Sequence, residues 1–332
     1  MIGAAPAGRE VSITGLGYKV PDRVVTNDDL AKFVDTSDEW IVERTGIRER
    51  RMAADSEALS DLALPAAQDA LRQAGIDGHD LDLIIVATVT PDMAFPSTAA
   101  ILADALGATD AAAYDLSAGC TGFMYALAQA YGMLAGGLAK RVLVVGGDLL
   151  SRILDWEDRS TLVLFGDGAG AVVLEPVAEQ GFLGFELGAD GAGGKNLWLP
   201  GSGSRLFDAS EKYVKMNGPE VFKFATRILV QSAEDLLATC GLTIDDVDLY
   251  IPHQANRRII DHATRKLGVP SDRVVINVDR YGNTSSGSIP LALADAAADG
   301  RLRPGELVLM TGMGAGLTWG SALLRWTKEM AA

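Results

Sequence analysis

A cysteine, a histidine and an asparagine with complementary chemistry each follow an apolar stretch of this 332-residue chain. A thiol can attack a carbonyl carbon, and an imidazole and a carboxamide can donate hydrogen bonds to a developing oxyanion. Together the three side chains have the chemistry to form a thioester and to use it. They stand in the segments Ser117-Ala-Gly-Cys120-Thr-Gly-Phe123, Pro252-His253-Gln-Ala-Asn256 and Tyr281-Gly-Asn283-Thr-Ser-Ser-Gly-Ser-Ile-Pro290.

Cys120 directly precedes an apolar, alanine-rich segment, residues 121–130, which predicts a helix. The positive end of the helix dipole is expected to lower the pKa of the Cys120 thiol and to favour the thiolate. A small cysteine packed in a core is the alternative for this residue. For Cys240, which we place within a helix among apolar residues, a packing role is the prediction.

His253 follows the apolar run 249–252, which predicts a buried strand, and α/β proteins usually place their chemistry at strand ends. A lone histidine is more often structural, but the polar and basic residues that follow this one favour a functional role. The alternative for Asn283 is that it is only a turn residue after Gly282. It stands, however, at the position that corresponds to Cys120 in an internal repeat.

The repeat contains two copies of an amphipathic helix, a glycine stop, an acidic turn and a buried strand. Chance similarity between two α/β halves is the alternative to duplication. Alternating helices and apolar strands predict an α/β fold with mostly parallel sheets covered on both faces. We place the boundary near residue 176, which gives halves 1–176 and 177–332, and we expect a long loop at 188–204. The corresponding segments are 66–75 with 232–241, 81–87 with 247–253, and 141–148 with 307–314.

The composition excludes several classes of protein. A net charge of −15 argues against a general nucleic-acid binder, which is normally basic. No stretch is long and apolar enough for a membrane span, and the N-terminus lacks the pattern of a signal peptide. Two cysteines argue against a disulfide framework and favour a cytoplasmic protein. The cysteines and the three histidines show no metal-ligand spacing, so we predict no metal site.

Further short motifs occur along nearly the whole chain, and their order and spacing are more specific than any one of them. They resemble the thiolase superfamily and, within it, the 3-oxoacyl-[acyl-carrier-protein] synthase III family, the initiating condensing enzymes of bacterial fatty acid synthesis. Besides the three segments above, the motifs are Thr36-Ser-Asp-Glu-Trp-Ile41, Arg44-Thr-Gly-Ile-Arg48, Ala94-Phe-Pro-Ser97, Phe165-Gly-Asp-Gly-Ala-Gly170 and Thr318-Trp-Gly-Ser321.

The resemblance implies a five-layered α-β-α-β-α sandwich and a two-step reaction without a cofactor. The Cys120 thiolate would take the acyl group from an acyl-CoA, malonyl-acyl carrier protein would lose carbon dioxide, and its carbanion would attack the Cys120 thioester. His253 and Asn283 would donate hydrogen bonds to the malonyl thioester oxygen, so His253 is expected to be buried and neutral. The backbone N–H groups of Cys120 and Ala315 would form the oxyanion hole.

The resemblance also implies substrate-binding residues and a homodimer, in which Phe95 would reach the pocket of the partner subunit. Met313 stands where a common family member has Phe, and the more pliable Met predicts a pocket that admits acyl groups larger than acetyl. The implied sites are CoA binding by Trp40, Arg44, Arg159 and Asn256, an acyl pocket of Phe95, Leu150, Phe165 and Met313, and carrier-protein docking on Lys223, Arg257, Arg258, Arg265 and Lys266.

Positive charge beside an active-site mouth, on a chain of net charge −15, favours an acidic partner such as acyl carrier protein. A solvated helix face is the alternative for this basic segment. A papain-like protease also uses Cys, His and Asn, but its local cysteine signature is absent. Three rival functions keep the same fold: acyl transfer to another acceptor without decarboxylation, the starter step of a polyketide pathway, and the role of a non-catalytic partner subunit.

Overall fold

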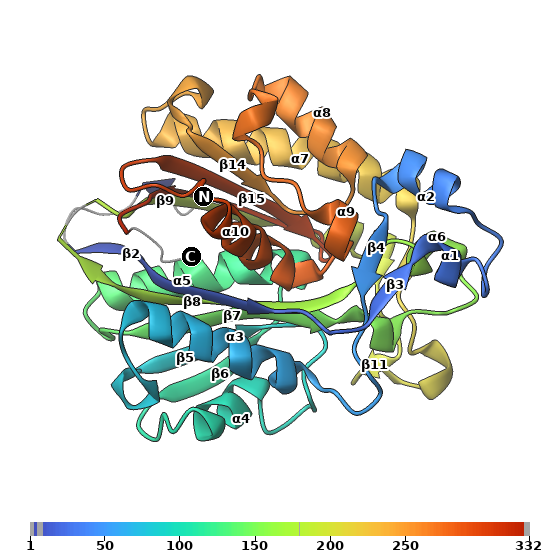
Figure 1. Ribbon diagram of the computed structural model, residues 1–332, viewed down its shortest axis with the longest axis horizontal. Coiled ribbons are helices and arrows are strands. Elements are labelled where there is room, and N and C mark those ends of the chain that lie inside the picture. Colours follow the sequence, from blue (N-terminus) through green and yellow to red (C-terminus); the bar gives the residue numbers. More distant parts are fainter. Residues whose placement is uncertain (1–2, 5–8, 179, 329–332) are drawn as a thin grey trace.

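The computed structural model describes residues 3–4, 9–178 and 180–328, which form an α/β structure with two five-stranded sheets (Figure 1). The first sheet has the strand order β2-β8-β7-β5-β6, and the second has the order β1-β9-β16-β15-β14. Their strands are β1 (Gly3–Ala4), β2 (Glu10–Lys19), β5 (Leu83–Ala87), β6 (Ala112–Leu116), β7 (Val142–Leu149), β8 (Asp167–Val177), β9 (Phe182–Ala189), β14 (Leu249–Pro252), β15 (Leu307–Gly314) and β16 (Thr318–Arg325).

Both sheets are mixed, so the prediction of mostly parallel sheets is wrong. In the first sheet β5 pairs in parallel with β6 and β7, whereas β8 is antiparallel to both of its neighbours. In the second, β14 and β15 are parallel and the other described pairs are antiparallel. A strand that is buried on both faces is apolar whatever the direction of its neighbours, so composition alone does not report that direction.

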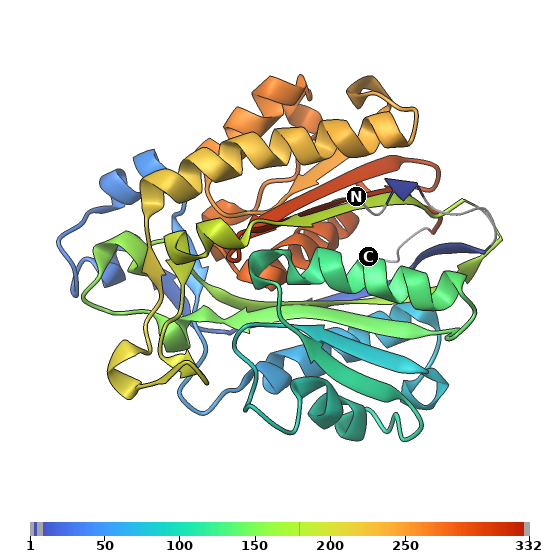
Figure 2. The same ribbon diagram turned by 180° about the vertical axis from the view of Figure 1, so that it is seen from behind.

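The helices lie outside and between the two sheets (Figures 1 and 2). Helices α5 (Gly122–Ala135) and α10 (Ser288–Ala298) lie between the sheets, and their apolar residues share one core cluster with strands of both. Helices α3 (Leu59–Ala74) and α4 (Thr98–Ala105) cover the outer face of the first sheet. Helices α7 (Gly218–Thr239) and α8 (Arg257–Leu267) cover that of the second.

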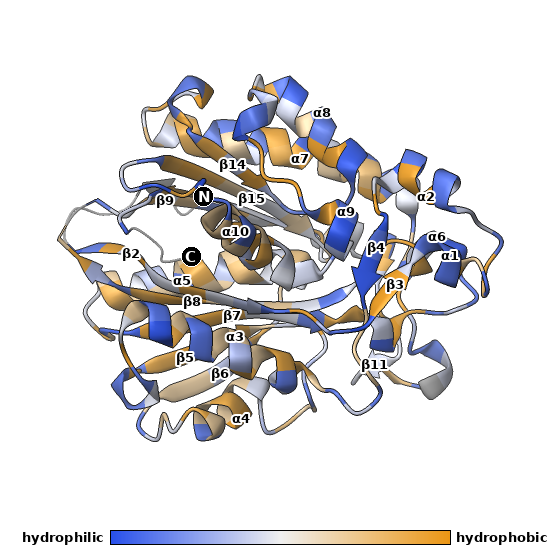
Figure 3. Cartoon of the chain, viewed as in Figure 1, coloured by the Kyte–Doolittle hydropathy of each residue, from blue (hydrophilic) through white to orange (hydrophobic). Residues whose placement is uncertain are grey.

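The hydropathy of each element agrees with its place (Figure 3). The central helices α5 and α10 are buried over most of their length, as expected for helices that are apolar around their whole circumference. Helix α8 is amphipathic: Ile259 and Ile260 are buried, while Arg257 and Arg258 are exposed. These contrasts fix which face of each helix meets a sheet.

The predicted helix and strand pairs of the repeat are confirmed as α3 with β5 and α7 with β14. The predicted strands at 141–148 and 307–314 are confirmed as β7 and β15. Cys240, however, caps the C-terminus of α7 instead of lying within it, and it is partly exposed. The expected loop at 188–204 contains the 3₁₀ turn Gly191–Asn196 and the short strands β10 (Leu197–Trp198) and β11 (Ser202–Gly203).

The remaining described elements are shorter. Among the described residues, no helix is both long and apolar enough to cross a membrane. The shorter elements are α1 (Asn27–Leu30), α2 (Asp38–Thr45), α6 (Arg159–Leu162), α9 (Val278–Tyr281), β3 (Val24–Thr26), β4 (Glu49–Arg51), β12 (Leu206–Phe207), β13 (Lys215–Met216) and the 3₁₀ turns Gly78–Asp80, Gly119–Thr121, Leu150–Ile153, Ala209–Glu211, Ile244–Asp246, Ser271–Arg273 and Ser285–Gly287.

Candidate active site

Cys120 is buried in the 3₁₀ turn Gly119–Thr121 that leads into α5, and the backbone around Gly314 and Ala315 packs against it. A Cβ atom on Gly119 would lie 2.8 Å from the Ala315 carbonyl oxygen, and one on Gly314 would lie 2.5 Å from the Cys120 nitrogen. Only glycine permits this approach. The backbone N–H groups of Cys120 and Ala315 both act to lower the pKa of the Cys120 thiol.

Burial raises the pKa of the Cys120 thiol to about 11, and the charge of Asp148 adds to this effect. A hydrogen bond from Ser285 and the two backbone N–H groups act in the opposite direction. The expectation of a lowered pKa is therefore wrong. The loss of water around the thiolate outweighs the favourable groups at the helix start, so the resting residue is a thiol.

His253 follows β14 and is buried, and its backbone N–H donates to the Thr311 carbonyl oxygen over 2.7 Å. Neither ring nitrogen has a hydrogen-bond partner in the part of the chain that the structure describes. Burial lowers the pKa of His253 to about 4, because a charged imidazole would lose its hydration. This agrees with the expectation of a buried, neutral imidazole.

Gln254 fixes the loop that carries His253, a role that the sequence did not reveal. Its Nε2 donates to the carbonyl oxygens of Pro252 (2.8 Å) and Val275 (3.1 Å). Its Oε1 accepts from the backbone N–H of Asn277 over 2.9 Å. The buried Gln254 carboxamide thereby joins the end of β14 to the segment before α9.

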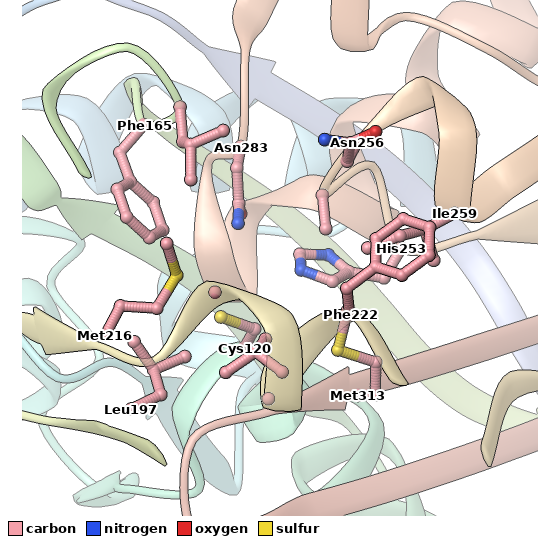
Figure 4. Close-up of a pocket in the computed structure, with 15 residues that line it drawn as sticks. Cys120, Phe165, Leu197, Met216, Phe222, His253, Asn256, Ile259, Asn283 and Met313 are labelled. Carbon is pink, nitrogen blue, oxygen red and sulfur yellow. The ribbon is translucent and has the colours of Figure 1, made fainter. Parts of the chain in front are cut away.

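Asn283 lies between α9 and the 3₁₀ turn Ser285–Gly287. Its backbone N–H donates to the Leu164 carbonyl oxygen (2.9 Å), and its carbonyl oxygen accepts from Gly166 (3.0 Å). The side-chain Oδ1 accepts from the Ser285 N–H over 2.9 Å. This bond orients the carboxamide so that its NH₂ group faces the cavity shared with Cys120 and His253 (Figure 4).

Two cavities meet at Cys120. The first has a volume of about 150 Å³ and is lined by all three chemically active side chains. The second has a volume of about 140 Å³ and mainly apolar walls, and Cys120, Phe165 and Leu197 line both. Apolar residues on the far side of the second cavity are Val89, Leu150, Ile153, Leu154, Leu199 and Val214.

Of the three residues implied for the acyl pocket within one subunit, two line the same cavity. Leu150 and Phe165 line the second cavity, but Met313 lines the first, beside His253. Phe95 lines neither cavity and is 85% exposed. Met313 packs in a cluster with residues of α7 and α8, so in this structure its size does not set the volume of the second cavity.

The residues implied for CoA binding do come together at the mouth. The guanidinium carbons of Arg44 and Arg159 each lie 4.6 Å from the centroid of the Trp40 ring, a cation–π distance. Asn256 lines the first cavity, and its Nδ2 donates to the Arg44 carbonyl oxygen over 3.1 Å. Helices α2, α6 and α8 therefore converge at one end of this cavity.

A buried arginine that the sequence did not single out holds two of these helices. The Arg50 guanidinium donates to Asn27 Oδ1 (2.8 Å) and to the carbonyl oxygen of Val163 (2.9 Å), the residue that caps α6. Asn27 in turn donates to Asp38 at the start of α2 over 2.8 Å. The network sets the spacing between the helices that carry Trp40 and Arg159.

Basic side chains are exposed on α7 and α8, the two helices whose first turns line the first cavity. Arg258 stands over the ring of Phe222, with 5.5 Å between its guanidinium carbon and the ring centroid, and Phe222 lines the first cavity. Arg257 pairs with Asp261 on the same helix. All five residues implied for carrier-protein docking are exposed: Lys223 on α7, and Arg257, Arg258, Arg265 and Lys266 on α8.

Two family models match the chain. Residues 114–191 match "3-Oxoacyl-[acyl-carrier-protein (ACP)] synthase III", and residues 237–326 match the model of the C-terminal part of the same family. The matched segments contain Cys120, His253 and Asn283, the three side chains that line the first cavity.

The chain is also similar to proteins over nearly its whole length. It is 55% identical to the β-ketoacyl-[acyl-carrier-protein] synthase III of Symbiobacterium thermophilum, over 96% of this chain and 98% of that protein. A crystal structure of the Thermus thermophilus synthase III aligns with a TM-score of 0.91 and 52% identity, covering 95% of this chain and 99% of that one. The priming β-ketosynthase of the R1128 polyketide pathway aligns with a TM-score of 0.90 and 38% identity, covering 96% and 97%.

Proposed function

Since the chain belongs to the 3-oxoacyl-[acyl-carrier-protein] synthase III family, we propose that Cys120 carries an acyl group as a thioester while His253 and Asn283 stabilise an enolate. The activity is the condensation of an acyl-CoA with malonyl-acyl carrier protein, which initiates fatty acid synthesis. The observation that carries this division of roles is that the three side chains line one cavity.

In the first half-reaction, the sulfur of Cys120 attacks the carbonyl carbon of the acyl-CoA. A bond forms between that carbon and the Cys120 sulfur, the bond to the CoA sulfur breaks, and the thiol proton ends on CoA. The backbone N–H groups of Cys120 and Ala315 bind the oxyanion of the tetrahedral intermediate. Their effect on the Cys120 thiol supports this role, because groups that lower its pKa also favour negative charge on a carbonyl oxygen attached there.

In the second half-reaction, malonyl-acyl carrier protein loses carbon dioxide, and the electron pair of the broken C–C bond forms an enolate. His253 and Asn283 donate hydrogen bonds to its oxygen. The low pKa of His253 supports this role, because a neutral imidazole does not quench the carbanion with a proton. The enolate carbon attacks the Cys120 thioester, the C–S bond breaks, and the sulfur takes up a proton.

Each cavity receives a different part of the acyl-CoA. The acyl chain fits the second cavity, since its walls are apolar and it adjoins Cys120. The pantetheine arm fits the first, with Asn256 as a hydrogen-bonding group along it. Trp40, Arg44 and Arg159 receive the nucleotide of CoA at the mouth. Both guanidinium groups now contact the indole, so stacking of the adenine on Trp40 requires one of them to move.

Acyl carrier protein docks on the basic residues beside the mouth. Lys223, Arg258, Arg265 and Lys266 are exposed there on a chain whose net charge is −15. Local positive charge on an acidic protein selects an acidic partner and orients it during encounter. The contact of Arg258 with Phe222 supports this docking site, because Phe222 lines the cavity into which the carrier-bound malonyl group would enter.

The chain forms a homodimer through the edge of its first sheet. β6 is an edge strand of that sheet, and Tyr114 on it is 37% exposed. Phe95 and Met93 are 85% and 48% exposed, and both precede the helix that packs beside β6. Unpaired strand edges and exposed apolar side chains together favour association with a second copy.

The two halves, 1–176 and 177–332, derive from one duplicated unit and build a five-layered α-β-α-β-α sandwich. Support comes from the equivalent places of Cys120 and Asn283, each in or just before a 3₁₀ turn that leads into a central helix, α5 or α10. The order of elements also corresponds, since β5 follows α3 in the first half and β14 follows α7 in the second. A duplication explains why two distant segments supply opposite walls of the same cavity.

Intact mass spectrometry after exposure to a panel of acyl-CoAs tests the division of roles. The wild type gains the mass of one acyl group from at least one donor, and Cys120→Ala gains none. Malonyl-acyl carrier protein then releases carbon dioxide and removes the acyl group. An adduct in Cys120→Ala, or deacylation without release of carbon dioxide, would contradict the proposal and favour simple acyl transfer.

The starter step of a polyketide pathway is a second candidate, favoured by the 38% identity to a priming β-ketosynthase. The higher identity to fatty-acid synthases III, 55% and 52%, makes fatty acid synthesis the stronger assignment. The identity of the carrier protein that accepts the acyl group distinguishes the two pathways. The acyl-enzyme is offered malonyl groups on a fatty-acid carrier protein and on a polyketide carrier protein, and the faster condensation identifies the pathway.

A further inference from the structure

We propose that Ser285 is a further catalytic residue, whose hydroxyl donates a hydrogen bond to the Cys120 sulfur and favours the thiolate that attacks the acyl-CoA. The inference rests on the proposed role of Cys120 as the nucleophile. Ser285 is buried and lines the second cavity together with Cys120, and its side chain acts to lower the pKa of the Cys120 thiol. It is therefore a polar group beside the reacting sulfur in an otherwise mainly apolar wall.

The backbone of Ser285 is the second observation. Its φ of +53° lies in the left-handed region, where among the described residues every other positive φ belongs to a glycine. A glycine would adopt this conformation without strain, whereas a side chain there is disfavoured. Such strain is typical of functional positions that the surrounding structure holds in place.

Hydrogen bonds on both sides of Ser285 hold it in this conformation. Its own N–H donates to Asn283 Oδ1 over 2.9 Å. The next residue, Ser286, donates from its N–H (3.2 Å) and its hydroxyl (2.8 Å) to Asp148, and its hydroxyl also lies 2.8 Å from the Ala87 carbonyl oxygen. Anchored to both neighbours, the Ser285 hydroxyl has a fixed direction.

The electrostatics explain why the nucleophile needs this donor. Burial raises the pKa of the Cys120 thiol to about 11, and the Asp148 carboxylate adds to the cost of a second negative charge. His253 is neutral, since burial lowers its pKa to about 4, and supplies no compensating cation. Among the described residues, Ser285 is the side chain that acts to lower the pKa of Cys120, and the backbone N–H groups of Cys120 and Ala315 act in the same direction.

The chemical step is the acylation already written for Cys120. The S–H bond breaks, the sulfur forms a bond with the acyl carbon, the bond from that carbon to CoA breaks, and CoA leaves with the proton. The Ser285 hydroxyl keeps its own proton throughout and shares it with the sulfur as charge builds up. A hydrogen bond to a charged acceptor in a buried site is stronger than one to a neutral group.

Ser285→Gly and Ser285→Ala test the proposal through the pH dependence of Cys120 alkylation and the rate of acylation. Loss of the donor raises the apparent pKa for alkylation in both variants and slows acylation about 10- to 100-fold. Glycine suits the positive φ, so Ser285→Gly remains at least as stable as the wild type. Should Ser285→Ala fail to fold, the glycine variant decides the test alone. Peptide mapping distinguishes Cys120 from Cys240.

Ser232→Ala is the control, because it removes a buried hydroxyl on α7 that donates to Glu186 and takes no part in the site. It lowers stability and leaves the alkylation pKa of Cys120 unchanged. Wild-type alkylation profiles in both Ser285 variants would overturn the proposal, as would an equal shift in Ser232→Ala. Alkylation needs no acyl-CoA, so a missing acyl adduct in the wild type would count against the proposed function instead.

Discussion

The hydroxyl groups of Thr121 and Thr318 lie 2.6 Å apart in a buried hydrogen bond between residues 197 positions apart in the sequence. Thr121 follows the nucleophile, and Thr318 begins β16 after the loop that contains Ala315. Thr318 also donates to the Ala315 carbonyl oxygen over 2.8 Å. The bond therefore fixes the spacing between the two N–H groups of the proposed oxyanion hole.

Thr318→Val deletes this hydroxyl while keeping the shape of the side chain. The Ala315 carbonyl oxygen loses a buried partner, so we expect the free energy of unfolding to fall by about 1–3 kcal/mol. Both half-reactions slow together, because each passes through an oxyanion at the same site. Urea unfolding and single-turnover kinetics measure the two effects, and Thr318→Ser restores both. Normal acylation in a Thr318→Val enzyme of reduced stability would refute the link to the oxyanion hole.

His253 makes stability depend on pH. Its pKa is about 4 in the folded protein and about 6.5 when unfolded, so between these values the unfolded chain binds the extra proton. The free energy of unfolding therefore rises with pH across this window, and the contribution of His253 is lost as the pH falls from 6.5 to 4, by roughly 3 kcal/mol. Urea unfolding at several pH values checks this against His253→Asn, whose curve is flatter. Parallel curves would contradict a buried neutral His253.

Charge reversal on α8 tests carrier-protein docking. Arg258→Glu is expected to raise the KM for malonyl-acyl carrier protein on the order of tenfold, because it replaces attraction by repulsion at the mouth. The KM for acyl-CoA changes less. The matched control is Arg72→Glu on α3, an exposed arginine on the opposite side of the molecule (Figure 1). Equal effects of the two reversals would indicate a general effect of net charge.

Phe95→Asp tests the homodimer. We expect the wild type to sediment as a dimer and the variant as a monomer at low micromolar concentration, since a charge at an apolar contact remains unpaired when buried. Phe33→Asp is the control, because Phe33 is also exposed, at 57%, but lies in the α1–α2 connection. A wild type that is monomeric would reject the proposal, as would a fully dimeric Phe95→Asp variant.

The sequence was sufficient to predict the main helices and strands and the convergence of three side chains on one cavity. Periodic apolar residues and glycine stops are local signals, and they predicted α3, β5, α7 and β14. The convergence of Cys120, His253 and Asn283 followed from strand ends and loop–helix junctions, whose places in such a fold are regular.

Properties that arise from packing between distant segments could not be predicted. The helix start at Cys120 indicated a lowered pKa, but burial by both halves raises it. Met313 was expected in the acyl pocket with Leu150, yet it lines the other cavity, because it packs against residues of α7 and α8. The roles of Ser285 and Arg50 depend on single hydrogen bonds to distant residues, and serines in glycine-rich turns were the one signal available for the former.

The position of Cys120 between two cavities has a consequence for the order of events. An acyl group stored in the second cavity leaves the first one free once CoA has departed. Acyl-CoA and malonyl-acyl carrier protein can then use the first cavity in turn, so the same contacts bind the pantetheine arm of each. Double-reciprocal plots of rate against one substrate, at several concentrations of the other, are parallel for such an enzyme. An excess of either substrate inhibits, because it occupies the first cavity at the step that requires the other substrate.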